Sequence, residues 1–417
     1  MTRAVSSLYT SFLDAPPAAC LSVPFHGPSD ACDEAANSAA SLISNSSNDG
    51  GDGGGNSGGG GSAGHGRSLL VTGTYTLDKE TQVRSGSLVL HEVLIEGKQD
   101  GIELKHHQTL PLPSGSVLDI RLLKASASPS FPSGCKLLVA TSTGQVSVYS
   151  VSPTCITFLS THQVTDAATL ILSLSISPDG LLVSTTTSDS KIHILKFTDS
   201  TFTSLKQVSE IENVHTGLEA WTSIFSLDGK TLYSGGDDGS FASWDLSSLE
   251  NGEDDEEEQT VGQTYRNRNI HTAGVTSILP VAISGTEYII TGSYDQYVRI
   301  FSPSTKRWLD TSVDLEGGVW RLELLSNENF DLIPKEKGNS SDENTVIYVL
   351  ASCMHAGCCI LSAEFKGGVE IEHVSLTPIA TMKEHESMNY ASACVGRDAP
   401  MFVSTSFYDR RVCCWSL

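Results

Sequence analysis

The chain has 417 residues, 39% hydrophobic and 18% charged, and its 49 acidic against 26 basic residues give a formal net charge of −23. This excess of negative charge argues against binding nucleic acid through its phosphates, which requires a basic surface, and favours a basic or cationic partner. No apolar run approaches the roughly 18 residues of a membrane-spanning helix, so we predict no membrane span.

The N-terminal segment MTRAVSSLYTSFLDAPPAAC contains no continuous apolar stretch and does not resemble a secretory signal. Ten cysteines are scattered along the chain and include two adjacent pairs, Cys358–Cys359 and Cys413–Cys414. Adjacent cysteines fit buried strand positions in a reducing compartment better than a disulfide framework. We therefore expect a cytoplasmic protein.

From residue 69 onward one local pattern recurs: an apolar strand, a tight turn and a second strand. Its seven copies are LLVTGTYTLDKETQVRSGSLVLHEV, LLVATSTGQVSVYSV, LLVSTTTSDSKIHILKF, LYSGGDDGSFASWDL, IITGSYDQYVRIFS, YVLASCMHAGCCIL and MFVSTSFYDRRVCCWSL. In the last six copies the aligned turn residues are Thr143, Asp189, Asp238, Asp295, His355 and Asp409. Seven repeats of short strands bounded by turns predict an all-β fold, a seven-bladed WD-repeat β-propeller with four antiparallel strands per blade.

Two of these repeats contain the hydrogen-bonded tetrad of WD repeats, which combines His, Ser or Thr, Asp and Trp. The complete sets are His215, Ser234, Asp238 and Trp244, and His385, Ser404 or Thr405, Asp409 and Trp415. A third repeat has His271 and Asp295 but Phe301 in place of the tryptophan. Because buried polar groups need partners, a structural role is the simplest interpretation of the tetrad residues.

The two ends of the chain are predicted to meet in one blade. The last repeat stops at VCCWSL, a third strand, and the N-terminal VSSLYTSFLD could supply the fourth, which would leave no open sheet edge. ACLSVPF would then begin the first blade. The whole chain, 1–417, would be a single propeller domain.

Three segments do not read as strands. Residues 27–66 are rich in Gly and Ser and cannot bury a core, so we predict a disordered insert within the first blade. Residues 251–259 form an acidic run and residues 334–345 a polar one, and both are predicted to be surface loops.

Several phrases, in order, resemble one family: GTYTL with RSGSLVLHEV, then TGSYDQYVRIF, EGGVWRLEL, ASCMHAGCCIL, HESMNYASACV and STSFYDRRVCCW. They are similar to the WD-repeat diphthine methyl ester esterase of the diphthamide pathway, from about Tyr75 to the C-terminus. The resemblance implies an enzyme that acts on translation elongation factor 2. It would hydrolyse the methyl ester of methylated diphthine, giving diphthine for amidation to diphthamide.

The candidate site follows from the turn at His355. In a propeller, the turns between second and third strands and the connections from fourth to first strands open at the same end of the central channel. His355 occupies a turn position where other repeats carry aspartate, and its third strand CCILSAE offers no tryptophan partner. An imidazole without a structural task is a candidate general base, and the alternative is a hydrogen-bonded turn histidine.

Other residues at this end could complete the chemistry of ester hydrolysis. Arg321, or the amides near Gly317 and Gly318, could stabilise the oxyanion, and Asp295 could orient the histidine or offset substrate charge. Tyr294, Trp320 and Tyr408 could face the trimethylammonium group of the substrate. Asp409 and His385 could contact the substrate, with the tetrad as their structural alternative. No GxSxG motif is present, so Ser293 and Ser406 are only secondary candidates for a nucleophile.

No metal site is predicted, because strand alternation sends Cys358 and Cys359 to opposite faces. Without a P-loop or a dinucleotide fingerprint, no organic cofactor is predicted either. We expect a monomer with elongation factor 2 as its protein substrate. The alternative function is a non-catalytic WD-repeat scaffold or adaptor that binds a protein partner on the same face through aromatic anchors.

Overall fold

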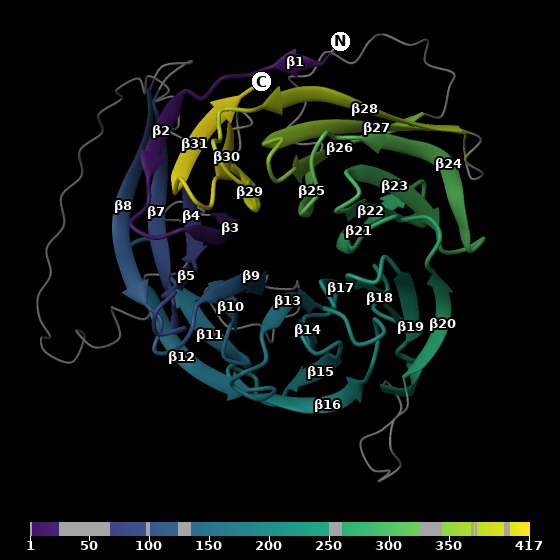
Figure 1. Cartoon of the computed structure of the whole chain (residues 1–417), viewed down its shortest axis with the longest axis horizontal. Helices are drawn as coiled ribbons and strands as arrows, with labels where there is room; N and C mark the ends of the chain where they lie inside the picture. The colour runs from purple at the N-terminus through teal and green to yellow at the C-terminus, as the bar shows by residue number, and fades with distance from the viewer. Residues whose placement is uncertain are drawn as a thin grey trace, which may run out of the picture.

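Seven of the sheets, each built on four antiparallel strands, stand around a central axis as blades (Figure 1). The computed structural model describes residues 2–24, 67–96, 101–123, 135–249, 261–325, 344–367, 371, 373–395 and 401–417. The predicted all-β, seven-bladed propeller is confirmed. The predicted segments 27–66 and 251–259, and residues 334–343 of the third, lie outside the described residues.

Each blade contains four strands, ordered from the channel outward. Blade 1 has β3 (Pro17–Pro24), β4 (Arg67–Thr74), β7 (Ser87–Glu96) and β8 (Gly101–Pro111). Blade 2 has β9 (Val117–Leu123), β10 (Cys135–Thr141), β11 (Gln145–Val151) and β12 (Ile156–Gln163). Blade 3 has β13 (Ile171–Ile176), β14 (Leu182–Thr187), β15 (Ile192–Phe197) and β16 (Leu205–Ile211). Blade 4 has β17 (Thr222–Phe225), β18 (Thr231–Gly235), β19 (Phe241–Asp245) and β20 (Gly262–Asn267), with a short 3₁₀ helix (Ser247–Leu249) after β19.

The remaining blades follow the same order. Blade 5 has β21 (Val275–Ile283), β22 (Thr286–Ser293), β23 (Tyr297–Ser302) and β24 (Arg307–Asp314). Blade 6 has β25 (Arg321–Leu325), β26 (Thr345–Ser352), β27 (Cys358–Lys366) and β28 (His373–Met382). Blade 7 has β29 (Ala391–Val395), β30 (Met401–Thr405), β31 (Arg411–Ser416) and β2 (Tyr9–Phe12). A small hairpin, β5 (Thr76–Leu77) and β6 (Arg84–Ser85), lies in the connection between β4 and β7.

The ring closes through the N-terminal segment, as predicted. β2 pairs antiparallel with β31, with Tyr9 opposite Cys414 and Phe12 opposite Arg411. The pairing provides blade 7 with its outer strand, so the two chain ends lie side by side in Figure 1. One strand was not predicted: β1 (Arg3–Ala4) adds in parallel to the outer edge of β28, so the segment reaches blade 6 as well.

The hydrophobic core consists of seven clusters, and each cluster joins neighbouring blades. Alternate residues of a strand point to opposite faces of its sheet, and both faces of a blade are covered by its neighbours. At the seam between blades 6 and 7, for example, Phe402 and Trp415 stack with their ring centroids 4.5 Å apart and pack with Ile360. Burial on both faces explains why the inner strands are rich in apolar residues, whereas outer strands such as β12, β20 and β24 carry many exposed polar residues.

The tetrad predicted in blade 4 is complete. His215 contacts Asp238 through Nδ1 at 2.9 Å and Ser234 through Nε2 at 3.1 Å, and the Trp244 indole donates to Ser234 at 2.9 Å. Burial lowers the pKa of His215 despite the neighbouring carboxylate. This network ties the turn between the second and third strands to the connection that enters the blade.

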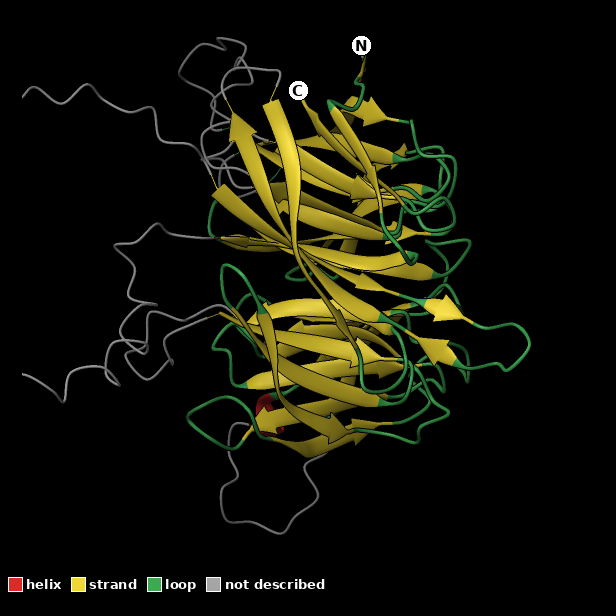
Figure 2. Cartoon of the chain, turned by 90° about the vertical axis from the view of Figure 1, so that its left-hand side faces the viewer, coloured by secondary structure: helices red, strands yellow, loops and turns green. Residues whose placement is uncertain are grey.

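The strands run between two broad faces, seen from the side in Figure 2. We call the upper face the one at which second strands turn into third strands and fourth strands connect to the next blade. Every connection of the upper face belongs to the described residues, so its geometry can be followed around the whole ring. No helix in the described part of the chain is long and apolar enough to cross a membrane.

Candidate active site

The turn that carries His355 joins β26 to β27 on the upper face. Its backbone is closed by hydrogen bonds from Cys353 N to Gly357 O and from Ala356 N to Cys353 O, both 2.8 Å. The His355 side chain is exposed and makes no hydrogen bond or ion pair with any described residue. The structure therefore does not favour the alternative of a hydrogen-bonded turn histidine.

A backbone bridge fixes this turn to the connection between blades 6 and 7. Met354 N donates to Asn389 O at 3.2 Å, and Asn389 N donates to Met354 O at 3.0 Å. The buried Asn389 amide in turn donates to the carbonyls of Ala391 and Thr405 at 3.0 and 2.8 Å. His355 is thus carried on a backbone held from both sides, with Tyr390 next to the bridge.

Gly317 and Gly318 pack directly against the same turn. A Cβ on Gly317 would lie 2.2 Å from the carbonyl oxygen of Cys353, and one on Gly318 would lie 2.8 Å from Sδ of Met354. Both glycines are buried, yet neither amide donates a hydrogen bond to a described residue. Buried amides without acceptors next to a candidate base fit the predicted oxyanion site.

Arg321 lies in the channel rather than free at its mouth. Nη2 of Arg321, at the start of β25, pairs at 2.9 Å with Oδ1 of Asp119 in β9, and Nη1 of Arg121 pairs with the same oxygen at 3.0 Å. The innermost strands of adjacent blades contact one another in a closed ring, and β9 and β25 are not neighbours in it, so the Arg321 pair crosses the channel. The Asp119 side chain is fully buried. Because its guanidinium pairs with Asp119, Arg321 is a poor candidate for the oxyanion donor, and the glycine amides are the remaining candidates.

Sequence reasoning missed Asp119, the partner of Arg321. Its carboxylate also accepts hydrogen bonds from the amides of Ile120 and Leu174, at 2.8 and 2.9 Å. A charged residue within the apolar strand VLDIRLL was the available signal, since buried charges require partners. The identity of the partner depends on a contact between strands about 200 positions apart and could not be read from the sequence.

Asp295 has a structural role in blade 5. Its carboxylate accepts hydrogen bonds from Arg299 Nη1 at 2.9 Å, Thr272 N at 2.9 Å and Tyr297 N at 3.1 Å, and its side chain is 4% exposed. Burial alone would raise the pKa of Asp295, but these hydrogen bonds outweigh it and the pKa is lowered. The carboxylate is occupied by its own blade, which argues against the predicted role of orienting His355.

His385 and Asp409 also have a structural role, the one that the tetrad assigned to them as the alternative to substrate contact. His385 Nε2 contacts Ser404 Oγ at 2.8 Å, and the Trp415 indole donates to the same oxygen at 3.2 Å. Asp409 accepts a hydrogen bond from Glu386 N at 3.1 Å. Burial lowers the pKa of His385 to about 4, so this imidazole is neutral near pH 7. We assign both residues to holding blade 7 together.

Tyr294, Trp320 and Tyr408 belong to a larger aromatic row on the upper face, which sequence reasoning found only in part. The row consists of Trp221, Tyr294, Trp320, Tyr390, Phe407 and Tyr408, with Tyr75 beside Phe407; adjacent ring centroids lie 5.0 to 6.1 Å apart. All seven rings come from turns or connections of the upper face. Tyr408 is 70% exposed, and the others are partly buried. One member of the row, Tyr390, belongs to the connection whose backbone is bridged to the His355 turn.

The two serines considered as nucleophiles are both buried with no exposed surface. Ser293 Oγ donates to the carbonyl of Ala273 at 3.1 Å and accepts from Asp295 N at 3.1 Å, so it stabilises its own turn. Neither serine has a histidine within hydrogen-bonding distance in the described residues. The arrangement favours a base that activates water over a serine nucleophile.

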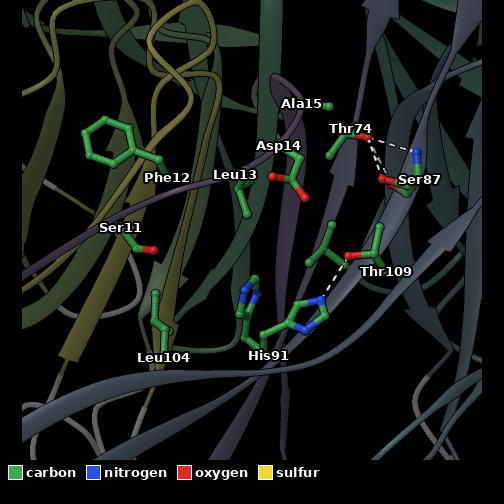
Figure 3. Close-up of a pocket in the computed structure, with 12 residues that line it drawn as sticks. Ser11, Phe12, Leu13, Asp14, Ala15, Thr74, Ser87, His91, Leu104 and Thr109 are labelled. Atoms are coloured by element: carbon green, nitrogen blue, oxygen red, sulfur yellow. Dashed lines mark hydrogen bonds between the residues drawn. The ribbon is translucent and has the colours of Figure 1, made fainter.

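A separate cavity of about 220 Å³ lies between the outer strand of blade 7 and blade 1 (Figure 3). Asp14, His91 and His106 line it, and His106 Nε2 contacts Thr109 Oγ1 at 2.9 Å. His91 Nδ1 has no partner, and burial lowers its pKa to about 4. None of the predicted site residues lines this cavity, so we treat it as distinct from the candidate site.

Comparison with known proteins supports the resemblance drawn from the sequence. Residues 153–195 match the family described as WD domain, G-beta repeat. A protein named diphthine methyltransferase from Schizosaccharomyces pombe is 29% identical over 354 residues, covering 83% of this chain and 90% of that protein. The human diphthine methyltransferase is 28% identical over 148 residues, which cover 35% of this chain and 26% of the human protein.

A homologue of diphthine methyltransferase from Dictyostelium discoideum is 37% identical over 106 residues, 25% of this chain and 28% of that protein. Among solved structures, a chain in the crystal structure of the mitotic checkpoint complex superposes with a TM-score of 0.53 and 15% identity, over 84% of each chain. At that identity the similarity shows the propeller fold alone. The resemblance to a WD-repeat protein of diphthine chemistry is therefore confirmed by named relatives.

Proposed function

We propose that this protein hydrolyses the methyl ester of methylated diphthine on translation elongation factor 2, in the cytoplasm, giving diphthine for amidation to diphthamide. The names of its relatives connect the chain to methyl chemistry on diphthine. The observation that carries the hydrolytic assignment is the exposed, unpaired His355 on a fixed turn that contacts Gly317. Base and oxyanion donors are the two elements that ester hydrolysis requires.

In the proposed reaction, His355 accepts a proton from water as the water oxygen attacks the ester carbonyl carbon. The carbonyl oxygen becomes an oxyanion that accepts hydrogen bonds from the amides of Gly317 and Gly318. Collapse of the tetrahedral intermediate breaks the bond to the methoxy oxygen. The imidazolium returns its proton to this oxygen, so that methanol leaves, and the carboxylic acid that remains releases its proton to solvent as the carboxylate.

The magnitudes of these contributions set the expected effect of mutation. A positioned general base contributes about 10²- to 10⁴-fold to the rate. Removing one oxyanion donor costs about 10²- to 10³-fold. Replacement of His355 should therefore lower the rate by at least about 100-fold without changing the fold, because its side chain contacts no described partner.

The test is mass spectrometry of elongation factor 2 carrying methylated diphthine, incubated with wild type, His355→Ala or His373→Ala. His373 is an exposed histidine at the start of β28, at the opposite end of the blade, and serves as the matched control. We expect loss of one ester methyl group and release of methanol with the wild type and His373→Ala, and almost none with His355→Ala.

The same assay separates the competing functions. Ester loss without any added methyl acceptor supports hydrolysis, whereas loss only with an acceptor would favour methyl transfer. Equal activity of His355→Ala and wild type would exclude His355 as the base. Binding of the factor without methyl release would favour the scaffold function instead.

A further inference from the structure

Three aromatic rings at one end of the aromatic row touch one another. Trp221 precedes β17, Tyr294 follows β22 and Trp320 precedes β25, so three separate segments bring them together. Their centroids are 5.8 Å (Trp221–Tyr294), 5.5 Å (Trp221–Trp320) and 5.9 Å (Tyr294–Trp320) apart. We call these residues the aromatic triad. A cation centred over so small a triangle lies within about 6 Å of all three centroids, the range of a cation–π interaction.

Carboxylates flank the triad. The Trp221 indole donates to Oδ1 of Asp237 at 3.0 Å, and the amide of Asp237 donates to the carbonyl of Glu219 at 2.9 Å. Oδ2 of Asp237 accepts no hydrogen bond from the described residues. The pKa of Tyr294 is raised by burial first and then by the charges of Tyr390, Asp237 and Glu219, so both carboxylates act on this ring.

The absence of a side chain at Gly274 brings ring and carboxylate together. A Cβ at this position would lie 3.0 Å from Oδ1 of Asp237 and 3.0 Å from Cδ2 of Tyr294. Glycine therefore lets the ring and the carboxylate approach the same point of the backbone. The triad and Asp237 form one continuous surface of aromatic faces and negative charge.

Purely structural aromatic clusters are usually covered by other side chains, but all three triad rings keep part of their surface exposed, and Asp237 is exposed. The surface offers π faces and negative charge, and the indole hydrogen of Trp221 is donated to Asp237. A phosphate or carboxylate ligand would be repelled. A cation that needs no hydrogen-bond acceptors, and is surrounded by methyl groups, fits both features.

We propose that the aromatic triad and Asp237 bind the quaternary ammonium group of a modified protein side chain. The identity of that side chain rests on the proposed function. The binding of a quaternary ammonium group by the triad does not. It would distinguish a fully methylated, permanently charged substrate from a neutral one of equal shape. Glu219 adds long-range attraction for the cation.

The first experiment is a ligand-observed NMR titration of the wild-type protein with choline and with 3,3-dimethylbutan-1-ol, its neutral isostere. We expect choline to bind about three- to tenfold more tightly, because only the cation gains from the π faces and the carboxylates. Equal affinities would overturn the proposal. The titration needs neither an ester nor elongation factor 2, so it can succeed or fail independently of the hydrolysis assay.

Variants locate the site. Asp237→Asn keeps an oxygen for the Trp221 indole but removes the charge, so choline should bind about threefold more weakly while dimethylbutanol is unchanged. Trp221→Leu should weaken both ligands. The matched control is Asp310→Asn, an exposed aspartate on the outer strand β24, which should bind as wild type. Equal choline binding by wild type and Asp237→Asn would contradict the assignment.

Two further ligands identify the source of the ammonium group. Trimethyl-lysine should bind comparably to choline, whereas phosphocholine should bind more weakly because Asp237 and Glu219 repel its phosphate. Tighter binding of phosphocholine than of choline would indicate a lipid headgroup and overturn the assignment to a protein side chain.

Discussion

The turn of blade 6 carries His355 where blades 5 and 7 carry an aspartate, because the connection that enters blade 6 differs too. In blades 5 and 7 the turn aspartates accept hydrogen bonds from Thr272 N and Glu386 N, next to the histidines of those connections. Blade 6 has Gly317 in the corresponding connection, and its backbone packs onto the turn without a side chain. A turn held by close packing needs no carboxylate, which leaves position 355 free to carry an imidazole.

Replacement of Gly317 tests this packing. In Gly317→Ala the new Cβ meets the carbonyl oxygen of Cys353 at 2.2 Å, a backbone atom that cannot move away alone. We expect a loss of about 1–3 kcal/mol in the free energy of unfolding, as for other overpacked sites, together with loss of ester hydrolysis. Urea denaturation and the mass-spectrometric assay measure the two effects.

Gly318→Ala is the matched comparison. Its Cβ meets Sδ of Met354 at 2.8 Å, the far end of a flexible side chain that can turn aside. It should therefore destabilise the protein less than Gly317→Ala. Equal stability of the two variants would mean that the turn is not held by the close contact at Gly317.

At the scale of elements, the ion pair between β9 and β25 connects opposite sides of the ring. Asp119→Ala would remove the carboxylate that pairs with Arg321 and Arg121 and accepts from the Leu174 amide, so we expect a loss of about 3–5 kcal/mol in unfolding free energy. Arg321→Met should cost less, because Arg121 still neutralises Asp119. Denaturation of both variants gives the order, and a larger loss for Arg321→Met would contradict it.

Local patterns predicted the blades well. Strand, turn and strand repeat within about 15 residues, so the seven blades, the tetrad around Asp238 and the closing strand near Tyr9 were all readable from the sequence. The predicted triad members Tyr294 and Trp320 were found because they lie in recognisable turns or connections.

Contacts between blades were not predictable. Trp221 meets Trp320 across about 100 positions, and Asp119 meets Arg321 across about 200, with no motif to relate them. The propeller places one residue from each blade around a common axis, so the site arises from spacing around the ring rather than along the chain. The sequence could therefore name single candidates such as His355 and not their partners.

At the scale of the whole molecule, buried histidines make stability depend on pH, and three of them have a strongly lowered pKa. His91, His271 and His385 are at most 8% exposed and come from blades 1, 5 and 7 or their connections. Burial lowers the pKa of each imidazole from 6.5 to about 4. In the unfolded chain all three would regain a pKa near 6.5.

The direction in which stability changes with pH follows from proton binding by the folded and unfolded states. Between about pH 6.5 and pH 4 the unfolded state binds protons that the folded state does not, so stability is complete above pH 6.5 and falls as the pH approaches 4. We expect a loss of roughly 2 kcal/mol per histidine between pH 7 and pH 5. Carboxylates contribute little in this window, because they titrate mainly below it.

His91 allows the clearest measurement, since its imidazole makes no hydrogen bond with a described residue and Nδ1 is unpartnered beside the cavity in Figure 3. His91→Leu should remove one histidine's share of the pH dependence, so that its unfolding free energy falls less than that of the wild type between pH 7 and pH 5. His373→Leu, at an exposed position, should keep the wild-type slope. If His91→Leu also kept it, the buried neutral imidazole would not be a source of the acid sensitivity.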